Sequence, residues 1–425
     1  MTLARRSLLA GLAVTAAAPA LAKSSDFKGL KTALEKAIQG DGVLDLPAGR
    51  YVTDTLELAQ PLSIRGVPGR TILAAKGGGP LLSITGTAHV TLSGVTFDGG
   101  DAPPTEDQSL VFCDTVEDLL IENCAFINGK GSGLRLKSCA GRISGNRFSA
   151  IAQTALFSRN AKGLEISGND VRDIGNNGIQ VWTSESSEDG TIVSGNRVAR
   201  IAAKAGGDGQ NGNGINVYKA GNVIVANNRI SDCAFSAVRN NQGSNCQITG
   251  NSISRTGEVA IYCEFGFEGA VVSGNLIADV AFGISITNFN EGGRLAVVSN
   301  NVVRNVSGGG TLPYTSAVGI GAEGDTQVTG NVVENAAQTG IGLGWGKYCR
   351  NLSATSNLVR NCGRGITFSV SDGAEPVMIT NNRIAGSKQA AIQGMDQKEP
   401  VGPDLAENGG IVPSKSVISG NLVTA

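Results

Sequence analysis

The stretch LEISGNDV at residues 164–171, followed by GIQV at residues 178–181, is one copy of a phrase that the chain repeats. Two short apolar pieces flank a Gly-Asn pair, and a third apolar piece begins with Gly. Where nothing is inserted, successive copies lie about 22 to 26 residues apart, and self-similarity at such a period predicts a solenoid. The Asn of the pair, preceded by Gly or a close variant, recurs as Asn146, Asn169, Asn196, Asn228, Asn251, Asn275, Asn301, Asn331, Asn357, Asn382 and Asn421.

Length and composition fit one long repeat rather than several domains. A chain of 425 residues would usually divide into roughly two or three domains, but a solenoid grows freely because each coil contacts only its neighbours. The 60 Gly residues and the 41% hydrophobic content indicate many tight turns between short buried strands. The net charge of −1 provides no basic face for nucleic acid, and no apolar run after the first residues is long enough to span a membrane.

The first residues carry the pattern of an export signal. Arg5 and Arg6 precede an apolar run at residues 8–18, and the small-x-small pattern at residues 20–22 predicts cleavage near Ala22. The stretch ARRSLL at residues 4–9 resembles the twin-arginine export signal, although Leu8 stands where Phe is commoner. The resemblance implies that the twin-arginine export machinery recognises residues 1–22 and that the mature protein is periplasmic or secreted. An ordinary secretory signal that carries two Arg is the alternative.

Eight Cys residues would suggest disulfides in an exported protein, but their positions favour free thiols. Cys233 and Cys362 occupy the same place in their repeats, yet five coils separate them. At about 4.8 Å per coil this is about 24 Å, far beyond the reach of a disulfide. No CxxC pair or Cys-His cluster is present to hold zinc. We expect the Cys side chains to be small buried hydrophobic groups.

The N-terminal part indicates how the solenoid starts. Apolar residues from Phe27 to Ile38 follow helical spacing and predict a short helix that covers the open end. The stretch VLDLPAGRY at residues 43–51, with the repeated Gly-Asn phrase, resembles the pectate-lyase-like right-handed β-helix superfamily. More narrowly, the whole chain resembles twin-arginine-translocated β-helix repeat proteins, a group without an established activity. The resemblance implies an all-β fold at residues 23–425, a single-stranded right-handed parallel β-helix of about 13 coils with a short N-terminal α-helical cap.

The repeated Asn has a structural explanation. Each coil needs sharp corners, and Asn is the non-Gly residue that best tolerates the left-handed backbone conformation. Stacked Asn side chains can also bond from coil to coil through their amides. We therefore expect the Asn row to be part of the scaffold and not a catalytic row.

In the superfamily that the chain resembles, each coil has three strands, and the third carries the active sites of lyases and hydrolases. Residues 178–181 belong to this third strand. Insertions concentrate beside it. The Asn-to-Gly spacing doubles between Asn196 and Gly214, and other extra residues lie at 307–316, 184–189, 287–293, 344–347 and 369–375. Because loops carry function on a rigid scaffold, these insertions predict the walls of one long groove, with simple drift in loop length as the alternative.

Strand alternation predicts which side chains of the third strand face the groove. Aromatic, amide, Arg and acidic side chains are mixed there, which favours contact with sugar rings over a merely solvated strip. We expect the substrate-binding residues to be Gln180, Trp182, Asn216, Asn241, Glu323 and Trp345. The catalytic candidates are Tyr218, Lys219, Arg239, Tyr262, Glu264 and, from the long loop, Asp208.

Two catalytic schemes fit these candidates. In a β-eliminating polysaccharide lyase, a base removes the proton beside a uronate carboxylate while a cation stabilises the developing charge. These roles are open to the two Tyr residues, Lys219 and Arg239. A glycoside hydrolase needs two carboxylates at a set separation. For that scheme Glu264 would pair with Asp208 rather than with Glu323, which lies two coils away.

The sequence therefore predicts an exported β-helix protein that binds an acidic polysaccharide or acts on it as a lyase or hydrolase. The alternative is a non-catalytic structural or binding module of the cell envelope. No cofactor or metal site is predicted: the only His, His89, lies before the groove, and bound Ca²⁺ lacks a supporting acidic cluster. The catalytic interpretation requires Tyr218, Arg239, Tyr262 and Glu264 to converge beneath the Asp208 loop.

Overall fold

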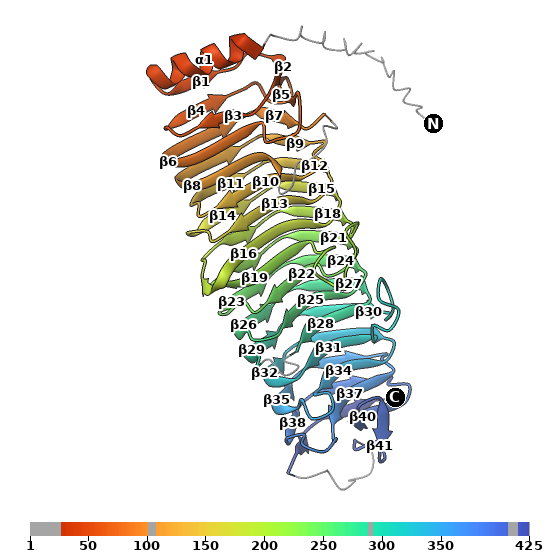
Figure 1. Ribbon diagram of the computed structural model, residues 1–425. Helices are drawn as coiled ribbons and strands as arrows, with labels where there is room; N and C mark the ends of the chain where they lie inside the picture. The colour runs from red at the N-terminus through yellow and green to blue at the C-terminus, as the bar shows by residue number, and fades with distance from the viewer. Residues whose placement is uncertain (1–26, 101–107, 288–291, 407–414, 425) are drawn as a thin grey trace, which may run out of the picture.

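The computed structural model describes residues 27–100, 108–287, 292–406 and 415–424, and the predicted export signal at residues 1–22 lies outside these ranges. Within them the chain is an all-β parallel solenoid of about 13 coils with a single short helix near its N-terminus (Figure 1). The predicted fold class and helical cap are confirmed. No helix of the described part is long and apolar enough to cross a membrane.

The helix α1 (Phe27–Gln39) lies across the N-terminal end of the solenoid (Figure 1). Leu30, Leu34 and Ala37 are buried at helical spacing, and α1 packs against β1 (Val43–Asp45) and β2 (Gly49–Thr53). The helix therefore covers apolar core that the first coil would otherwise expose to water.

Strands of successive coils pair in parallel and form three rows, which we call the first, second and third stacks. The first stack contains β1, β4 (Leu62–Arg65), β11 (Gly141–Ser144), β14 (Leu164–Ser167), β17 (Ile192–Ser194), β20 (Ile224–Ala226), β23 (Cys246–Thr249), β26 (Glu268–Ser273), β29 (Arg294–Ser299), β32 (Gly324–Thr329), β35 (Arg350–Thr355), β38 (Val377–Thr380) and β42 (Val417–Ser419). The second contains β2, β5 (Thr71–Ala75), β7 (Val95–Asp98), β9 (Ala125–Ile127), β12 (Arg147–Ile151), β15 (Asp170–Ile174), β18 (Arg197–Ile201), β21 (Arg229–Cys233), β24 (Ser252–Thr256), β27 (Leu276–Val280), β30 (Val302–Val306), β33 (Val332–Ala336), β36 (Leu358–Arg360), β39 (Arg383–Ala385) and β43 (Leu422–Thr424).

The third stack carries the candidate site. It contains β3 (Leu56–Leu58), β10 (Ser132–Lys137), β13 (Thr154–Arg159), β16 (Asn177–Glu188), β19 (Ile215–Gly221), β22 (Val238–Asn241), β25 (Val259–Glu264), β28 (Phe282–Ile286), β31 (Val318–Ala322), β34 (Thr339–Leu343), β37 (Arg364–Ser369) and β40 (Ala390–Asp396). The long strands β6 (Leu82–Ser93) and β8 (Ser109–Glu122) run from the third stack into the first stack of the following coil, which joins these two stacks into one sheet.

The repeated Asn side chains form a buried hydrogen-bonded ladder, as predicted. The Oδ1 atom of Asn169 accepts bonds from the backbone N–H of Asn146 at 2.9 Å and from its Nδ2 at 3.0 Å. The same pattern continues to Asn421. The predicted backbone role was wrong for this residue: the left-handed conformation belongs to the residue before it, for example Gly168 with φ 64°. The preceding position turns the corner, and the repeated Asn joins neighbouring coils.

All eight Cys residues are free and buried, as expected for small hydrophobic groups. Burial raises the pKa of these thiols, to about 12 for Cys124 and Cys246. At the C-terminal end, β40 pairs antiparallel with β41 (Glu399–Val401), and Asp404 accepts bonds from the backbone N–H groups of Ala391 and Ile392. These contacts satisfy part of the last strand edge of the third stack.

Candidate functional site

Two rows of side chains project outward from the third stack, as strand alternation predicted. The first row contains Gln180, Asn216, Arg239 and Tyr262, and the second contains Trp182, Tyr218, Asn241 and Glu264. Each row occupies the consecutive strands β16, β19, β22 and β25, because the parallel pairing keeps the same register from coil to coil. The structure thus brings eight of the predicted residues together.

Three aromatic side chains form a strip that we call the aromatic platform, consisting of Phe157, Trp182 and Tyr218. The rings of Phe157 and Trp182 meet edge to face at 5.1 Å, and those of Trp182 and Tyr218 lie 5.2 Å apart. A cation lies at each end: the Arg135 guanidinium is 5.4 Å from the Phe157 ring centre, and the Lys219 ammonium is 5.5 Å from that of Tyr218. Aromatic faces and nearby cations suit a ligand that carries both sugar rings and negative charge.

A charged group, the Arg239 cluster, lies beside the platform and consists of Arg239, Glu258, Glu264, Tyr262 and Asn241. Arg239 donates to both oxygens of Glu264, from Nε at 2.6 Å and from Nη2 at 3.0 Å, and Asn241 donates to Glu264 Oε1 at 2.7 Å. The Nη1 atom of Arg239 is 3.6 Å from Glu258, and the guanidinium lies 5.2 Å from the centre of the Tyr262 ring. The cluster therefore contains one cation and two carboxylates.

Burial governs the charges of this cluster. The side chains of Arg239, Glu258 and Glu264 are only 11%, 8% and 4% exposed. Burial raises the pKa of the Glu258 carboxyl, Arg239 opposes that effect, and the charges of Glu264 and Asp208 add to it. Burial, and then the charge of Glu264, also raises the pKa of the Tyr262 phenol, so this phenol is a poor base.

The long loop at residues 203–213 covers the cluster instead of standing beside it as a groove wall, which corrects the sequence prediction. The backbone of Gly209 packs so closely on Arg239 that an added Cβ atom would lie 1.8 Å from Nη1. Asn213 donates to the Gly209 carbonyl at 2.8 Å, and Asn177 donates to the Gln210 carbonyl at 3.2 Å. Asp208 itself is exposed.

Several predicted site residues are less accessible than expected. Gln180 and Asn216 face outward from their strands but are only 6% and 5% exposed. Glu264 is 3% exposed with both oxygens occupied, so it is not the open carboxylate that the hydrolase scheme assumed. Neighbouring side chains and the covering loop produce this burial, which strand alternation alone does not predict.

The remaining predicted residues lie elsewhere. Glu323 is buried two coils beyond Glu264, and Trp345 sits in a tight turn with Tyr348. Lys219 lies at the edge of the platform, 4.0 Å from the exposed Glu185. His89 is paired with Asp118 at 2.8 Å. Nowhere in the described ranges do three or more His, Cys, Asp or Glu side chains gather where they could hold a metal ion.

Three residues of the site were not predicted from the sequence. Phe157 and Arg135 stand at the position of Gln180 one and two coils earlier, so extending the same alternation toward the N-terminus would have found them. Glu258 precedes its strand, and no pattern in the sequence indicates that it turns toward Arg239.

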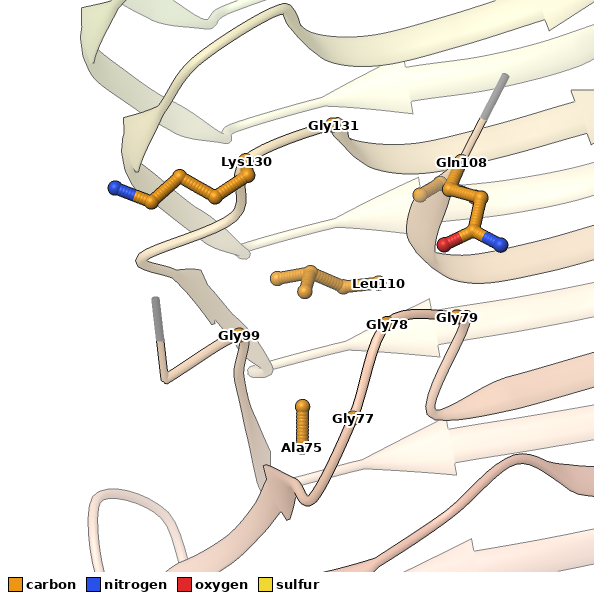
Figure 2. Close-up of a pocket in the computed structure, with 10 residues that line it drawn as sticks. Ala75, Gly77, Gly78, Gly79, Gly99, Gln108, Leu110, Lys130 and Gly131 are labelled. Atoms are coloured by element: carbon orange, nitrogen blue, oxygen red, sulfur yellow. The ribbon is translucent and has the colours of Figure 1, made fainter. Parts of the chain in front are cut away.

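Two hollows lie away from these rows. The smaller, about 20 Å³, is bounded by glycine backbone, and Figure 2 shows Leu110 between Gly78 and Gly99. It has room for about one water molecule. The larger, about 680 Å³, lies where β18, β21 and β24 end, and Thr311 of the loop at residues 307–316 forms part of its lining.

Comparison with known proteins agrees with the architecture. A family model described as the right-handed β-helix region matches residues 74–198 and 187–326. No curated protein sequence is significantly similar to the chain.

Solved structures with the same fold include a mannuronic acid specific polysaccharide family 6 lyase from human gut microbiota. It has a TM-score of 0.52 and 15% identity, with 90% of this chain and 92% of the lyase covered. The N-terminal fragment of gene product 12 of bacteriophage phi29 has a TM-score of 0.51 and 14% identity, over 85% of this chain and 65% of that one. Identities this low show a shared fold alone.

Proposed function

The chain belongs to the right-handed β-helix family, and on that premise we propose that its third stack binds an acidic polysaccharide along the aromatic platform. One observation carries the proposal: three aromatic rings on consecutive coils have a cation at each end. Ring faces can stack on the apolar faces of sugars, and Arg135 and Lys219 can pair with uronate carboxylates. A lyase named as specific for mannuronic acid shares the fold, which makes an acidic polysaccharide a chemically suitable ligand to test.

Of the two catalytic schemes, β-elimination at Tyr218 and Lys219 fits the geometry better than hydrolysis. Both side chains are partly exposed beside the platform. Tyr218 would take the proton beside the uronate carboxylate, and Lys219 would stabilise the charge that develops there. The electron pair of the broken carbon–hydrogen bond then forms a carbon–carbon double bond as the glycosidic carbon–oxygen bond breaks, and Tyr218 returns the proton to the departing oxygen. Hydrolysis through Glu264 is disfavoured because Arg239 and Asn241 occupy its oxygens.

A non-catalytic binding module is the second candidate. The observation that favours it is the sealed state of the Arg239 cluster, whose charges pair with one another beneath Gly209. A buried ion cluster of this kind is compatible with a purely structural role. The platform would then bind polysaccharide without any chemical step.

Incubation with a panel of acidic and neutral polysaccharides distinguishes these functions. We expect new ultraviolet absorbance from an unsaturated uronate, lost in Tyr218→Phe and Lys219→Met. The matched control is Tyr314→Phe, because Tyr314 is 73% exposed on the loop at residues 307–316. New reducing ends without new absorbance would indicate hydrolysis, and binding without products would indicate the non-catalytic module. If no polymer binds, the proposal is wrong.

The proposal includes export of the β-helix formed by residues 23–425, after removal of residues 1–22. Replacing Arg5 and Arg6 by Lys should block export of a folded reporter fused to this segment, because the twin-arginine machinery requires the Arg pair. An unchanged exported fraction would favour an ordinary secretory signal.

A further inference from the structure

Four buried polar atoms without hydrogen-bond partners cluster on three consecutive strands. They are Trp182 Nε1 on β16, Asn216 Oδ1 on β19, and Arg239 Nη1 and Asn241 Oδ1 on β22. Asn216 and Arg239 are neighbours in the first row, and Trp182 and Asn241 lie on either side of Tyr218 in the second row. Native proteins rarely bury polar atoms unpaired, and a group of such atoms indicates a place that suits a polar ligand.

The chemistry of these atoms points to sugar hydroxyl groups. Two of them are donors, on Trp182 and Arg239, and two are acceptors, on Asn216 and Asn241. A hydroxyl both donates and accepts, so adjacent sugar hydroxyls could satisfy the mixed set. A carboxylate would suit it less, because the cluster already holds two carboxylates for one cation.

The loop at residues 203–213 covers the site that these four polar atoms line. Its Gly209 backbone lies directly on Arg239 Nη1, where no larger residue would fit. Its hydrogen bonds to the solenoid include one from Asn177 Nδ2 to the Gln210 carbonyl, and Asn176 and Asn177 accept bonds from the backbone N–H groups of Ala205 and Asn213. Water can replace such bonds at low cost, so the exposed part of the loop can lift while Gly212 stays packed on the buried ring of Phe235.

We propose that the Arg239 cluster and its unpartnered neighbours form a second saccharide subsite, closed by residues 203–213 in the free chain and entered when this loop opens. The inference rests on the proposed function, because the same polymer would continue from the aromatic platform. The platform would take the charged sugar residues, and the closed subsite would take the hydroxyl edge of the next residue.

Trp182 provides a direct reporter of opening. The chain has two Trp residues, so Trp345→Phe leaves Trp182 as the only one. In stopped-flow mixing with an acidic oligosaccharide, we expect a fast phase that is linear in concentration and a slow phase whose rate saturates, because opening limits it. Asn177→Ala, which removes loop bonds, should raise the saturating rate several-fold, whereas the control Gln247→Ala, at an exposed position of the first stack, should not.

Hydrogen exchange of the unmodified chain gives an independent readout that does not depend on how the variants fold. Saturating oligosaccharide should change the exchange of residues 203–213 and leave the first stack unchanged. A single linear phase, with equal rates in Asn177→Ala and no change in exchange, would overturn the closed subsite while leaving polysaccharide binding intact. Absence of any fluorescence response and of any binding would instead overturn the proposed function on which the subsite rests.

Discussion

Replacement of Arg239 by Met tests the buried charge cluster most strongly. The change removes the only cation of the cluster while keeping a side chain of similar length. Glu264 loses two hydrogen bonds, and Glu258 loses its nearby positive charge. All three side chains are at least about nine-tenths buried, so water cannot take over the role of the guanidinium.

The expected loss of unfolding free energy is about 3–5 kcal/mol, the usual cost of leaving a buried charge without its partner. The loss should depend on pH. Burial raises the folded-state pKa of the Glu258 carboxyl and Arg239 opposes this effect, so without Arg239 that pKa lies further above its unfolded value and the folded chain binds more protons. The stability of the variant therefore falls as pH rises, and its deficit should be larger near pH 8 than near pH 5.

Urea-induced unfolding, followed by circular dichroism at both pH values, measures this loss. Arg255→Met is the matched control, because the Arg255 side chain is 57% exposed and pairs with Asp232. The control should lose no more than about 1 kcal/mol. A loss below about 1 kcal/mol for Arg239→Met, or a loss that does not change with pH, would refute the buried cluster.

Three further predictions concern the scaffold and the cluster. Asn251→Ala removes an amide that accepts two hydrogen bonds from Asn228 and donates two others. Urea unfolding should therefore show a decrease of at least about 3 kcal/mol in the free energy of unfolding, whereas the neighbouring Ser252→Ala should change it little. Glu258→Gln should become more stable relative to the wild type as pH rises. Because the folded-state pKa of Glu258 is raised, the wild type is favoured at low pH and loses stability as this carboxyl ionises; equal pH profiles would contradict the raised pKa. A thiol reagent should modify none of the eight Cys residues in the native protein and all of them in denaturant, and rapid modification of native protein would contradict their burial.

The repeat made the fold predictable from the sequence. The Gly-Asn spacing sets the length of a coil, and alternation within each strand sets the facing of residues such as Ile179 and Gln180. Both patterns are local and recur from coil to coil, so a departure from the pattern in one coil does not obscure the fold prediction. The prediction that Asn adopts the left-handed conformation was wrong by one residue. Two neighbouring residues form each corner, and only the backbone angles show that the residue before the Asn has positive φ while the Asn side chain makes the hydrogen bonds.

The sequence predicted which residues share one face of the third stack, because strand register alone determines this. Alternation placed Trp182, Tyr218, Arg239 and Glu264 on one face, and they are found there on consecutive coils. Their burial depends on how the loop at residues 203–213 folds, and its conformation depends on long-range amide bonds with Asn176 and Asn177 that no local pattern reveals. For the same reason the sequence favours an open groove, whereas the structure has a covered cluster beside a partly exposed platform.

We propose that the aromatic platform recognises both the rings and the charges of a polysaccharide. The most direct test measures dissociation constants for one acidic polysaccharide and for its carboxyl-reduced form, with the wild type, Trp182→Ala and the control Tyr314→Ala. We expect clearly tighter binding of the acidic form and a roughly tenfold loss of affinity in Trp182→Ala alone, equivalent to about 1.4 kcal/mol for one aromatic contact. Equal affinity for the two polymers, or equal binding by Trp182→Ala and the wild type, would contradict it.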